Sequence, residues 1–86
     1  MIDELIDYCE EHKAWSRGFL QYGYWARVIN FLYKNIIIVK NADVKKIFEL
    51  AVACGLFYVE KRGYRYYYKY KSENEEPVNL YKITFD

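Results

Sequence analysis

The sequence predicts an α+β fold in which three helices pack on a small antiparallel three-stranded sheet. Apolar residues recur every three to four positions over much of the first two thirds of the chain, which is the period of an amphipathic helix. A later stretch alternates on both sides of Arg62 and Gly63, as the strands of a β-hairpin do. At 86 residues the chain suits one hydrophobic core, so we expect a single domain over residues 1–86.

The first two helices are expected from apolar spacing. Residues 2–13 form the first, with one apolar side made of Ile2, Leu5, Ile6 and Cys9. The glycine-interrupted segment WSRGFLQYG then contains either a loop or a short helical turn. The helical period returns from about Tyr22 to Lys34, which predicts the second helix. Trp15 and Trp25 are expected to anchor the core, with an interface role as the alternative.

A short strand and a third helix are expected next. Ile36–Val39 is β-branched and lies between asparagines, which favours a brief strand. The third helix begins near Asn41 or Asp43, because both are good N-cap residues, and Gly55 supplies a left-handed stop. Its apolar side consists of Val44, Ile47, Phe48, Ala51 and Cys54.

The segment FYVEKRGYRYYYKY predicts a hairpin with Arg62 and Gly63 as its two-residue turn. In that register Phe57 faces Tyr68, and Glu60 faces Arg65 as a cross-strand charge pair. The face turned toward the helices would hold Phe57, Val59, Tyr66, Tyr68 and Tyr70. The face turned outward would hold Tyr58, Glu60, Arg65, Tyr67, Lys69 and Lys71.

A third strand is expected after this hairpin. The charged segment SENEEP contains the only proline and predicts a polar loop, residues 72–77. The run VNLYKITFD then alternates, which would add Tyr81, Ile83 and Phe85 to the apolar face and Lys82 to the basic one.

Charge is distributed unevenly, although the net charge is only +1. Residues 1–14 carry −4, residues 15–39 carry +3, residues 40–71 carry +5 and residues 72–86 carry −3. A small net charge argues against a strongly nucleic-acid-binding protein, whereas the concentration of cations around the hairpin favours an anionic partner.

Several classes of function are not expected. Cys9 and Cys54 lie far apart and on apolar helix faces, which indicates buried, reduced thiols and a cytoplasmic protein. No basic and apolar leader is present, and the longest apolar run is too short to cross a bilayer, so no membrane partner is expected. Cys9 and His12 lack further metal ligands, and no catalytic constellation appears. We therefore expect no enzyme activity, no metal and no cofactor.

The segment ADVKKIFELAVACGLFYVEKRGYRYYYKY, about residues 41–70, carries a resemblance to a known family. A capped helix that leads through Gly-Leu-Phe into a hairpin resembles the N-terminal winged-helix domains of phage replication-organiser and DnaD-like initiation proteins. The resemblance implies a winged helix-turn-helix fold, with the hairpin as the wing. It also implies a viral or mobile-element protein, in the host cytoplasm, that acts in transcription or replication control.

Cations and tyrosines form the candidate nucleic-acid interface. Lysine and arginine neutralise phosphates, and exposed aromatic rings stack on bases. Base-edge readers are scarce on the third helix, which argues against strict sequence specificity. An ordinary solvated sheet face is the alternative for this set. The candidate residues are Lys45, Lys46, Lys61, Arg62, Arg65, Tyr67, Lys69, Lys71 and Lys82.

Two functional hypotheses follow. The first is a small DNA-binding protein of modest specificity that binds duplex or single-stranded DNA through the third helix and the outer face of the wing. The second is a protein-interaction module, either a homodimer or an inhibitor of a host protein, that uses the aromatic surface near Trp15–Tyr24. The small net charge and the poor reading helix favour the second.

Overall fold

The computed structural model describes residues 2–36 and 38–72 and has the expected α+β fold. Three helices, a single 3-10 turn and a three-stranded antiparallel sheet with strand order β1-β3-β2 make up the described part of the chain. This arrangement is compatible with a winged-helix layout, in which the β2–β3 hairpin is the wing. The elements are α1 (Asp3–Glu11), η1 (Ala14–Arg17), β1 (Leu20–Gln21), α2 (Tyr22–Tyr33), α3 (Asn41–Ala53), β2 (Phe57–Arg62) and β3 (Arg65–Tyr70).

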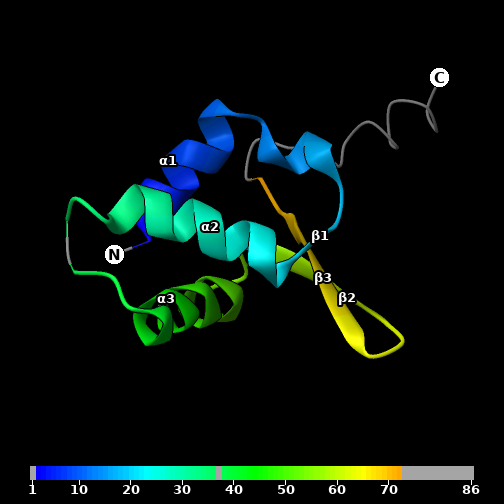
Figure 1. Cartoon of the computed structure of the whole chain (residues 1–86). Coiled ribbons are helices and arrows are strands. Elements are labelled where there is room, and N and C mark those ends of the chain that lie inside the picture. The colour runs from blue at the N-terminus through cyan, green and yellow to red at the C-terminus, as the bar shows by residue number, and fades with distance from the viewer. Residues whose placement is uncertain (1, 37, 73–86) are drawn as a thin grey trace, which may run out of the picture.

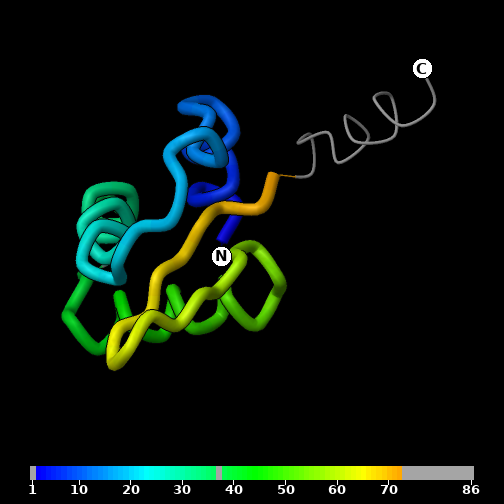
Figure 2. The backbone as a smooth tube through the Cα atoms, turned by 90° about the vertical axis from the view of Figure 1, so that its right-hand side faces the viewer, coloured from blue at the N-terminus to red at the C-terminus, as the bar shows by residue number. Residues whose placement is uncertain are grey.

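The helices gather at one end of the sheet, and the wing projects from the other. Figure 1 shows α1, α2 and α3 stacked from top to bottom on the left of the molecule, with the β2–β3 turn at the lower right. In the view turned by 90°, β3 crosses between the segment that contains β1 and the yellow-green β2 (Figure 2). Half of the hairpin therefore lies against the helices, and half extends beyond them.

The helix predictions hold with small changes of boundary. α2 is the predicted second helix almost unchanged, and α1 is shorter by one residue at its start and two at its end than the predicted range. At α3 the N-cap is Lys40, and Asp43 acts from the third helical position by accepting the backbone N–H of Lys40 at 3.1 Å. Asn41, offered as a cap, is the first residue of the helix.

Gly55 ends α3 as predicted. Its φ of +81° is in the left-handed region, which lets the N–H groups of Gly55 and Leu56 turn back onto the last helical carbonyls. The first donates to Val52 at 3.0 Å and the second to Ala51 at 3.1 Å, which is the hydrogen-bond pattern of a Schellman motif. The chain thereby passes directly from α3 into β2.

The predicted strand at Ile36–Val39 is wrong. Residues 36, 38 and 39 have no strand conformation, and Ile37 lies outside the described residues. The hairpin is instead joined by β1, which lies inside the segment expected to be a loop or helical turn. β1 pairs with β3, with Leu20 opposite Tyr68 and Gln21 opposite Tyr67. A β-branched run becomes a strand only where it meets a free sheet edge, and β1 meets that edge.

The hairpin register differs from the prediction by two residues. Gly63 and Tyr64 form the turn, so Phe57 pairs with Tyr70 rather than with Tyr68. A turn at Arg62 and Gly63 would require positive φ at an arginine, whereas the observed turn has positive φ at Gly63 only, at +63°. The predicted Glu60–Arg65 pair is therefore wrong, because Glu60 faces Tyr67.

A shift of two residues keeps every side chain on its predicted face. The inner face, toward the helices, carries the odd-numbered residues of β2 and the even-numbered residues of β3. The outer face carries the other set, which consists of Tyr58, Glu60, Arg62, Arg65, Tyr67 and Lys69. Gln21 joins the outer face from β1, because it pairs with Tyr67.

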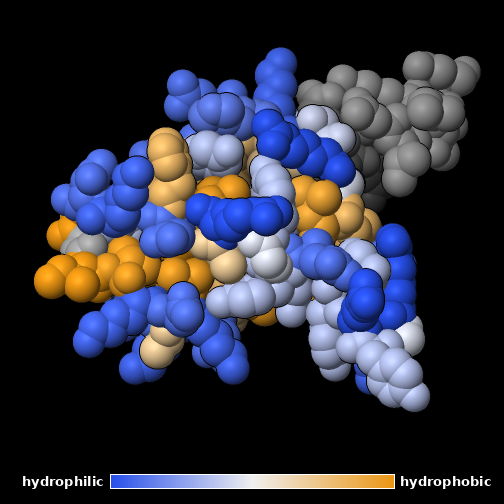
Figure 3. All heavy atoms as spheres, viewed as in Figure 1, coloured by the Kyte–Doolittle hydropathy of each residue, from blue (hydrophilic) through white to orange (hydrophobic). Residues whose placement is uncertain are grey.

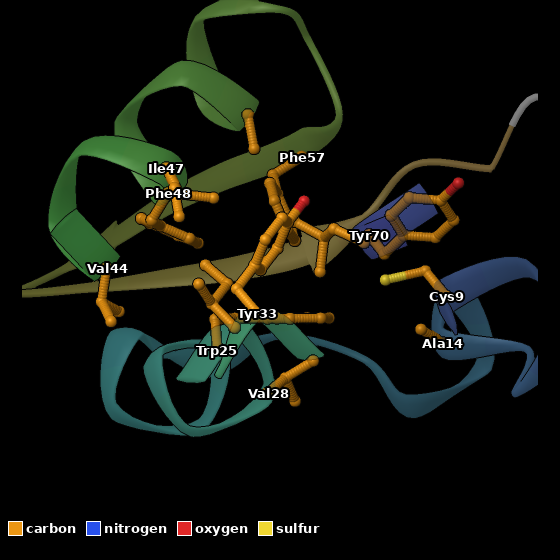
Figure 4. Close-up of a cluster of buried hydrophobic side chains, with 13 residues drawn as sticks. Cys9, Ala14, Trp25, Val28, Tyr33, Val44, Ile47, Phe48, Phe57 and Tyr70 are labelled. Carbon is orange, nitrogen blue, oxygen red and sulfur yellow. The ribbon is translucent and has the colours of Figure 1, made fainter. Parts of the chain in front are cut away.

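The core lies where α1, α2 and α3 meet the base of the hairpin, as Figure 4 shows. Trp25 is fully buried at its centre, where its indole packs edge-on against Phe57 at 4.7 Å between ring centroids and donates to the carbonyl of Tyr68 at 3.2 Å. Trp25 is thus the core anchor that the sequence predicts, while Trp15 is half-buried against the core.

Burial differs from the prediction toward the wing tip and at Cys54. The inner face toward the tip is open, with Val59 48% and Tyr66 49% exposed, because a groove rather than a packed contact lies between these residues and α3. Cys54 is exposed rather than buried, since the helix ends at that residue and turns away from the core. The strand predicted in VNLYKITFD and the residue Lys82 lie outside the described residues.

Candidate nucleic-acid interface

The outer face of the sheet brings together much of the predicted interface. Arg65, Tyr67 and Lys69 alternate along β3, and the cross-strand partner of Arg65 is Arg62. Two arginines side by side at the wing tip repel each other, and the Glu60 carboxylate offsets this repulsion by pairing with Arg62. Arg65 is exposed, whereas Tyr67 and Lys69 are half-buried within the face.

Lys61 and Lys71 take different positions. Lys61 belongs to the inner set, and its Nζ lies 5.7 Å from the centroid of the Tyr66 ring. Lys71 follows β3, and its Nζ lies 5.4 Å from the ring centroid of Tyr58, an outer-face residue. Lys71 therefore adds to the charge of the outer face, and Lys61 adds to the inner side of the wing.

Arg62 is the most constrained cation of the wing. Its Nε donates to Glu60 at 2.8 Å and its Nη2 donates to the same carboxylate at 3.2 Å. These hydrogen bonds hold the pKa of the Glu60 carboxyl below its ordinary value. The guanidinium also lies over two rings, with its Cζ 4.7 Å from the centroid of Tyr67 and 5.9 Å from that of Phe19.

A hollow of about 690 Å³ opens beside Tyr67, between β3, β1 and the start of α2. We call it the Phe19–Tyr67 hollow. Sequence reasoning missed it, because it depends on β1 pairing with β3, a contact between residues about 46 positions apart. The residues that line it are Phe19, Leu20, Gln21, Gly23, Tyr24, Arg27 and Tyr67.

Arg27 connects this hollow with the start of α3. It also lines a second hollow, of about 270 Å³, together with Tyr22, Asn30 and Asn41. Sequence reasoning counted Arg27 only in a charge total. Its exposed position on the first half of α2, within two turns of Gln21, was the signal that could have identified it.

Lys45 and Lys46 are exposed on α3, one turn before Glu49. Glu49 lines an apolar groove of about 410 Å³ between α3 and the wing, with Phe48, Val52, Val59 and Tyr66 among the other lining residues. A carboxylate and apolar side chains do not attract a phosphate backbone. The side of α3 that faces the wing is thus poorly suited to DNA, and neither lysine lines the groove.

Glu10 of α1 is engaged at the base of the sheet. Glu10 accepts the hydroxyl of Tyr70 at 2.6 Å and that of Ser72 at 2.9 and 2.7 Å, at the end of β3. This network ties α1 to the base of the sheet. The only carboxylate on the outer face among the residues described is then Glu60, which is paired with Arg62.

The thiols and His12 offer no metal site. Within the described residues, no three His, Cys, Asp or Glu side chains come close enough to hold a metal ion. The ring of His12 stacks on that of Tyr8 at 4.2 Å, and burial, with Glu10 nearby, raises the pKa of the Cys9 thiol to about 12. In residues 2–36 and 38–72 no helix has the length and apolar character needed to cross a membrane.

Comparison with known proteins identifies no relative. The chain matches no protein-family model, no curated protein and no solved structure. The resemblance to replication-organiser and DnaD-like domains therefore stays a prediction from residues 41–70.

Proposed function

We propose that this chain is a small DNA-binding protein of modest sequence specificity that acts through the outer face of its wing. The observation that carries the proposal is the composition of that face. Arg62, Arg65 and Lys69 lie around Tyr67, and the single described carboxylate among them is already paired. Lysine and arginine supply attraction to phosphates, and tyrosine supplies a surface for bases.

Modest specificity follows from the composition of α3. Discrimination between bases comes from paired hydrogen bonds by Arg, Asn or Gln to base edges in the major groove. Apart from Asn41 at its first position, the long exposed side chains of α3 are those of Lys45, Lys46, Glu49 and Leu50. The lysines contribute attraction to phosphate without reading sequence, which would suit a protein of replication or transcription control that binds many sites.

A salt series tests the proposal. Fluorescence anisotropy measures the binding of a labelled 15-nucleotide single strand and of a 15-base-pair duplex. The salt concentration is varied from about 25 to about 300 mM. The affinity should fall steadily as salt rises, because each phosphate contact releases a counterion. Failure to bind either DNA at the lowest salt would exclude the function.

Charge reversal locates the surface. The double variant Arg65→Glu/Lys69→Glu should abolish binding, since it replaces two outer-face cations by anions. The matched control Lys34→Glu/Lys40→Glu makes the same change in net charge at the α2–α3 connection, at the opposite end of the molecule from the wing tip (Figure 1). The control should reduce binding by much less. Equal losses in the two variants would place the DNA elsewhere.

A second candidate function is protein interaction, and an exposed apolar patch favours it. Phe31, Ile36 and Ile38 are 61%, 57% and 86% exposed at the end of α2 and in the α2–α3 connection. Figure 3 shows the corresponding orange surface at the left of the molecule. Contiguous exposed apolar side chains are typical of interfaces. The patch lies away from Trp15–Tyr24, the surface expected from the sequence.

The oligomeric state tests this alternative. If the patch joins two copies, sedimentation should show a concentration-dependent dimer that Ile38→Asp converts to a monomer. Ile38→Asp should leave DNA binding unchanged, because the residue is remote from the wing. A chain that stays monomeric at all concentrations and captures no protein from a cell extract would remove this alternative.

A further inference from the structure

The Phe19–Tyr67 hollow has features that the outer sheet face as a whole does not share. It is concave, its lining includes the aromatic residues Phe19, Tyr24 and Tyr67 from three segments of the chain, and Arg27 lies at its edge. Pockets that hold small molecules usually have volumes of about 300–1,000 Å³, which includes this one. Phe19 and Tyr67 are both half-buried, so each offers a ring that is partly supported and partly open.

We propose that this hollow holds an unpaired base, so that the protein binds single-stranded DNA in preference to duplex. The inference rests on the DNA binding proposed above and narrows it to one class of DNA. Tyr67 provides the stacking surface, Phe19 the second apolar wall, and Arg27 and Arg62 the contacts to the adjoining phosphates.

The position of Tyr67 is fixed before any ligand arrives. Its backbone pairs with β1 on one side and with β2 on the other, so Tyr67 lies on the central strand. Its hydroxyl accepts the amide of Gln21 at 3.4 Å across the β1–β3 pair. A ring held in place loses little freedom when a base stacks on it, which favours binding.

A planar cation already lies over the Tyr67 ring. The Arg62 guanidinium lies 4.7 Å from the Tyr67 centroid and 5.9 Å from that of Phe19. A nucleobase is likewise planar and stacks on aromatic rings without regard to its identity. The ring of Tyr67 is therefore accessible to a flat ligand from the outer side of the sheet.

Arg62 can move to a phosphate at low cost. Its ion pair with Glu60 is exposed to solvent, and exposed ion pairs contribute little to stability. Exchange of the Glu60 carboxylate for a phosphate keeps the charge-assisted hydrogen bonds of the guanidinium. Arg17 adds a further cation near the rim, where it donates from Nη1 to the hydroxyl of Tyr24 at 2.6 Å.

Duplex DNA could not use the hollow in this way. Bases inside a duplex are stacked on one another, and their faces become available only when they leave the stack. The alternative docking surface for a duplex, the side of α3 toward the wing, carries Glu49 and the apolar residues Val52 and Val59. Both observations favour a single strand.

The test compares the two kinds of DNA and two tyrosines. Anisotropy is measured with labelled dT15 and with a 15-base-pair duplex at one low salt concentration. Wild-type protein should bind dT15 more tightly than duplex. Tyr67→Ala should weaken dT15 binding roughly 5- to 150-fold, the loss expected for one stacked base. Tyr67→Phe, which keeps the ring, should bind within about threefold of wild type.

Two further variants control for position and folding. Tyr58→Ala removes the other outer-face tyrosine, which lies on β2 outside the hollow, and should weaken dT15 binding less than threefold. Arg27→Gln leaves the sheet unchanged and removes one proposed phosphate contact, so it should weaken dT15 binding. The affinity of this variant should also depend less steeply on salt concentration than that of the wild type. Circular dichroism checks that each variant is folded. If Tyr67→Ala is unfolded, Arg27→Gln and Tyr67→Phe carry the test.

The outcomes separate this inference from the broader function. Duplex bound as tightly as dT15, or equal losses in Tyr58→Ala and Tyr67→Ala, would overturn the single-strand site and leave DNA binding intact. An Arg27→Gln variant that binds dT15 like wild type would also overturn it. Failure to bind either DNA would overturn the proposed function itself.

Discussion

The base and the tip of the β2–β3 hairpin share one alternating pattern but have different environments. On the inner face, Phe57 and Tyr70 at the base are 6% and 2% exposed, whereas Val59 and Tyr66 toward the tip are 48% and 49% exposed. The side chains are similar in kind, and the strands are continuous. The difference is whether the helices cover them. Alternation therefore fixes which way a side chain points, and the length of the helical layer decides whether it is buried.

The largest expected effect comes from the base. Phe57→Ala should destabilise the fold by about 3–5 kcal/mol, because it leaves a cavity between Trp25, Phe48 and Tyr70. The free energy of unfolding is measured by urea titration. A loss below about 1 kcal/mol would show that the base is no better packed than the tip.

Alkaline pH should also lower the stability of the buried core. Burial, with smaller contributions from neighbouring carboxylates, raises the pKa of Cys9 and of Tyr33 to about 12. Because both folded values exceed the ordinary values of 9.0 and 10.0, this contribution is complete below about pH 9 and is lost as the pH rises toward 12. For each group, every rise of one pH unit between its ordinary and its raised pKa removes up to about 1.4 kcal/mol from the free energy of unfolding.

Melting temperatures between pH 8 and pH 12 measure this loss. The double variant Cys9→Ala/Tyr33→Phe should have a lower melting temperature at pH 8 but a smaller decline above it. A wild-type melting temperature that stays level from pH 9 to pH 11 would contradict the assignment.

The wing turn should show an intermediate effect. Gly63→Ala places a Cβ at a φ of +63°, which costs about 1–2 kcal/mol even though no neighbouring atom lies within 4 Å of that position. Hydrogen exchange should show faster opening near the turn and little change in α2. Unchanged protection throughout β2 and β3 would indicate that the turn does not control the pairing.

The smallest effect is expected at the tip. Tyr66→Ala should change the free energy of unfolding by less than about 1 kcal/mol, because half of the side chain is already in water and an open groove separates it from α3. Urea titration beside Phe57→Ala gives the direct comparison. A loss above about 2 kcal/mol would mean that the tip is covered in solution, for example by a second copy packed in the groove next to α3.

The sequence correctly predicted those structural features that depend on residues close together in the chain. The spacing of Val44, Ile47 and Phe48 predicted the buried side of α3, and Gly55 predicted its end. The two faces of the hairpin were also predicted, even though the register was wrong by two residues. The predicted and the observed register both keep apolar residues on one face, so the alternation could not distinguish them. The backbone angles of the turn residues select the observed register, because only Gly63 has to take a positive φ.

The candidate site was only partly predictable. Arg65, Tyr67 and Lys69 follow from alternation along one strand and are found together on the outer face. Arg27 was not proposed, and Phe19 was included only in the Trp15–Tyr24 surface for protein interaction, because nothing near them in the sequence indicates a neighbour on β3. The β-branched residues 36–39 attracted the strand prediction instead, since propensity alone does not reveal which segment reaches the sheet edge.

The sequence by itself determined the helical faces, the alternation of the hairpin, and the positive φ at Gly55 and Gly63. These depend on short-range sterics and on the separation of apolar from polar side chains. Only the tertiary structure decided that β1 completes the sheet, that the wing tip stays uncovered, and that Phe19, Arg27 and Tyr67 meet around one hollow. Those contacts join residues some 40 to 50 positions apart, and packing between whole elements selects them.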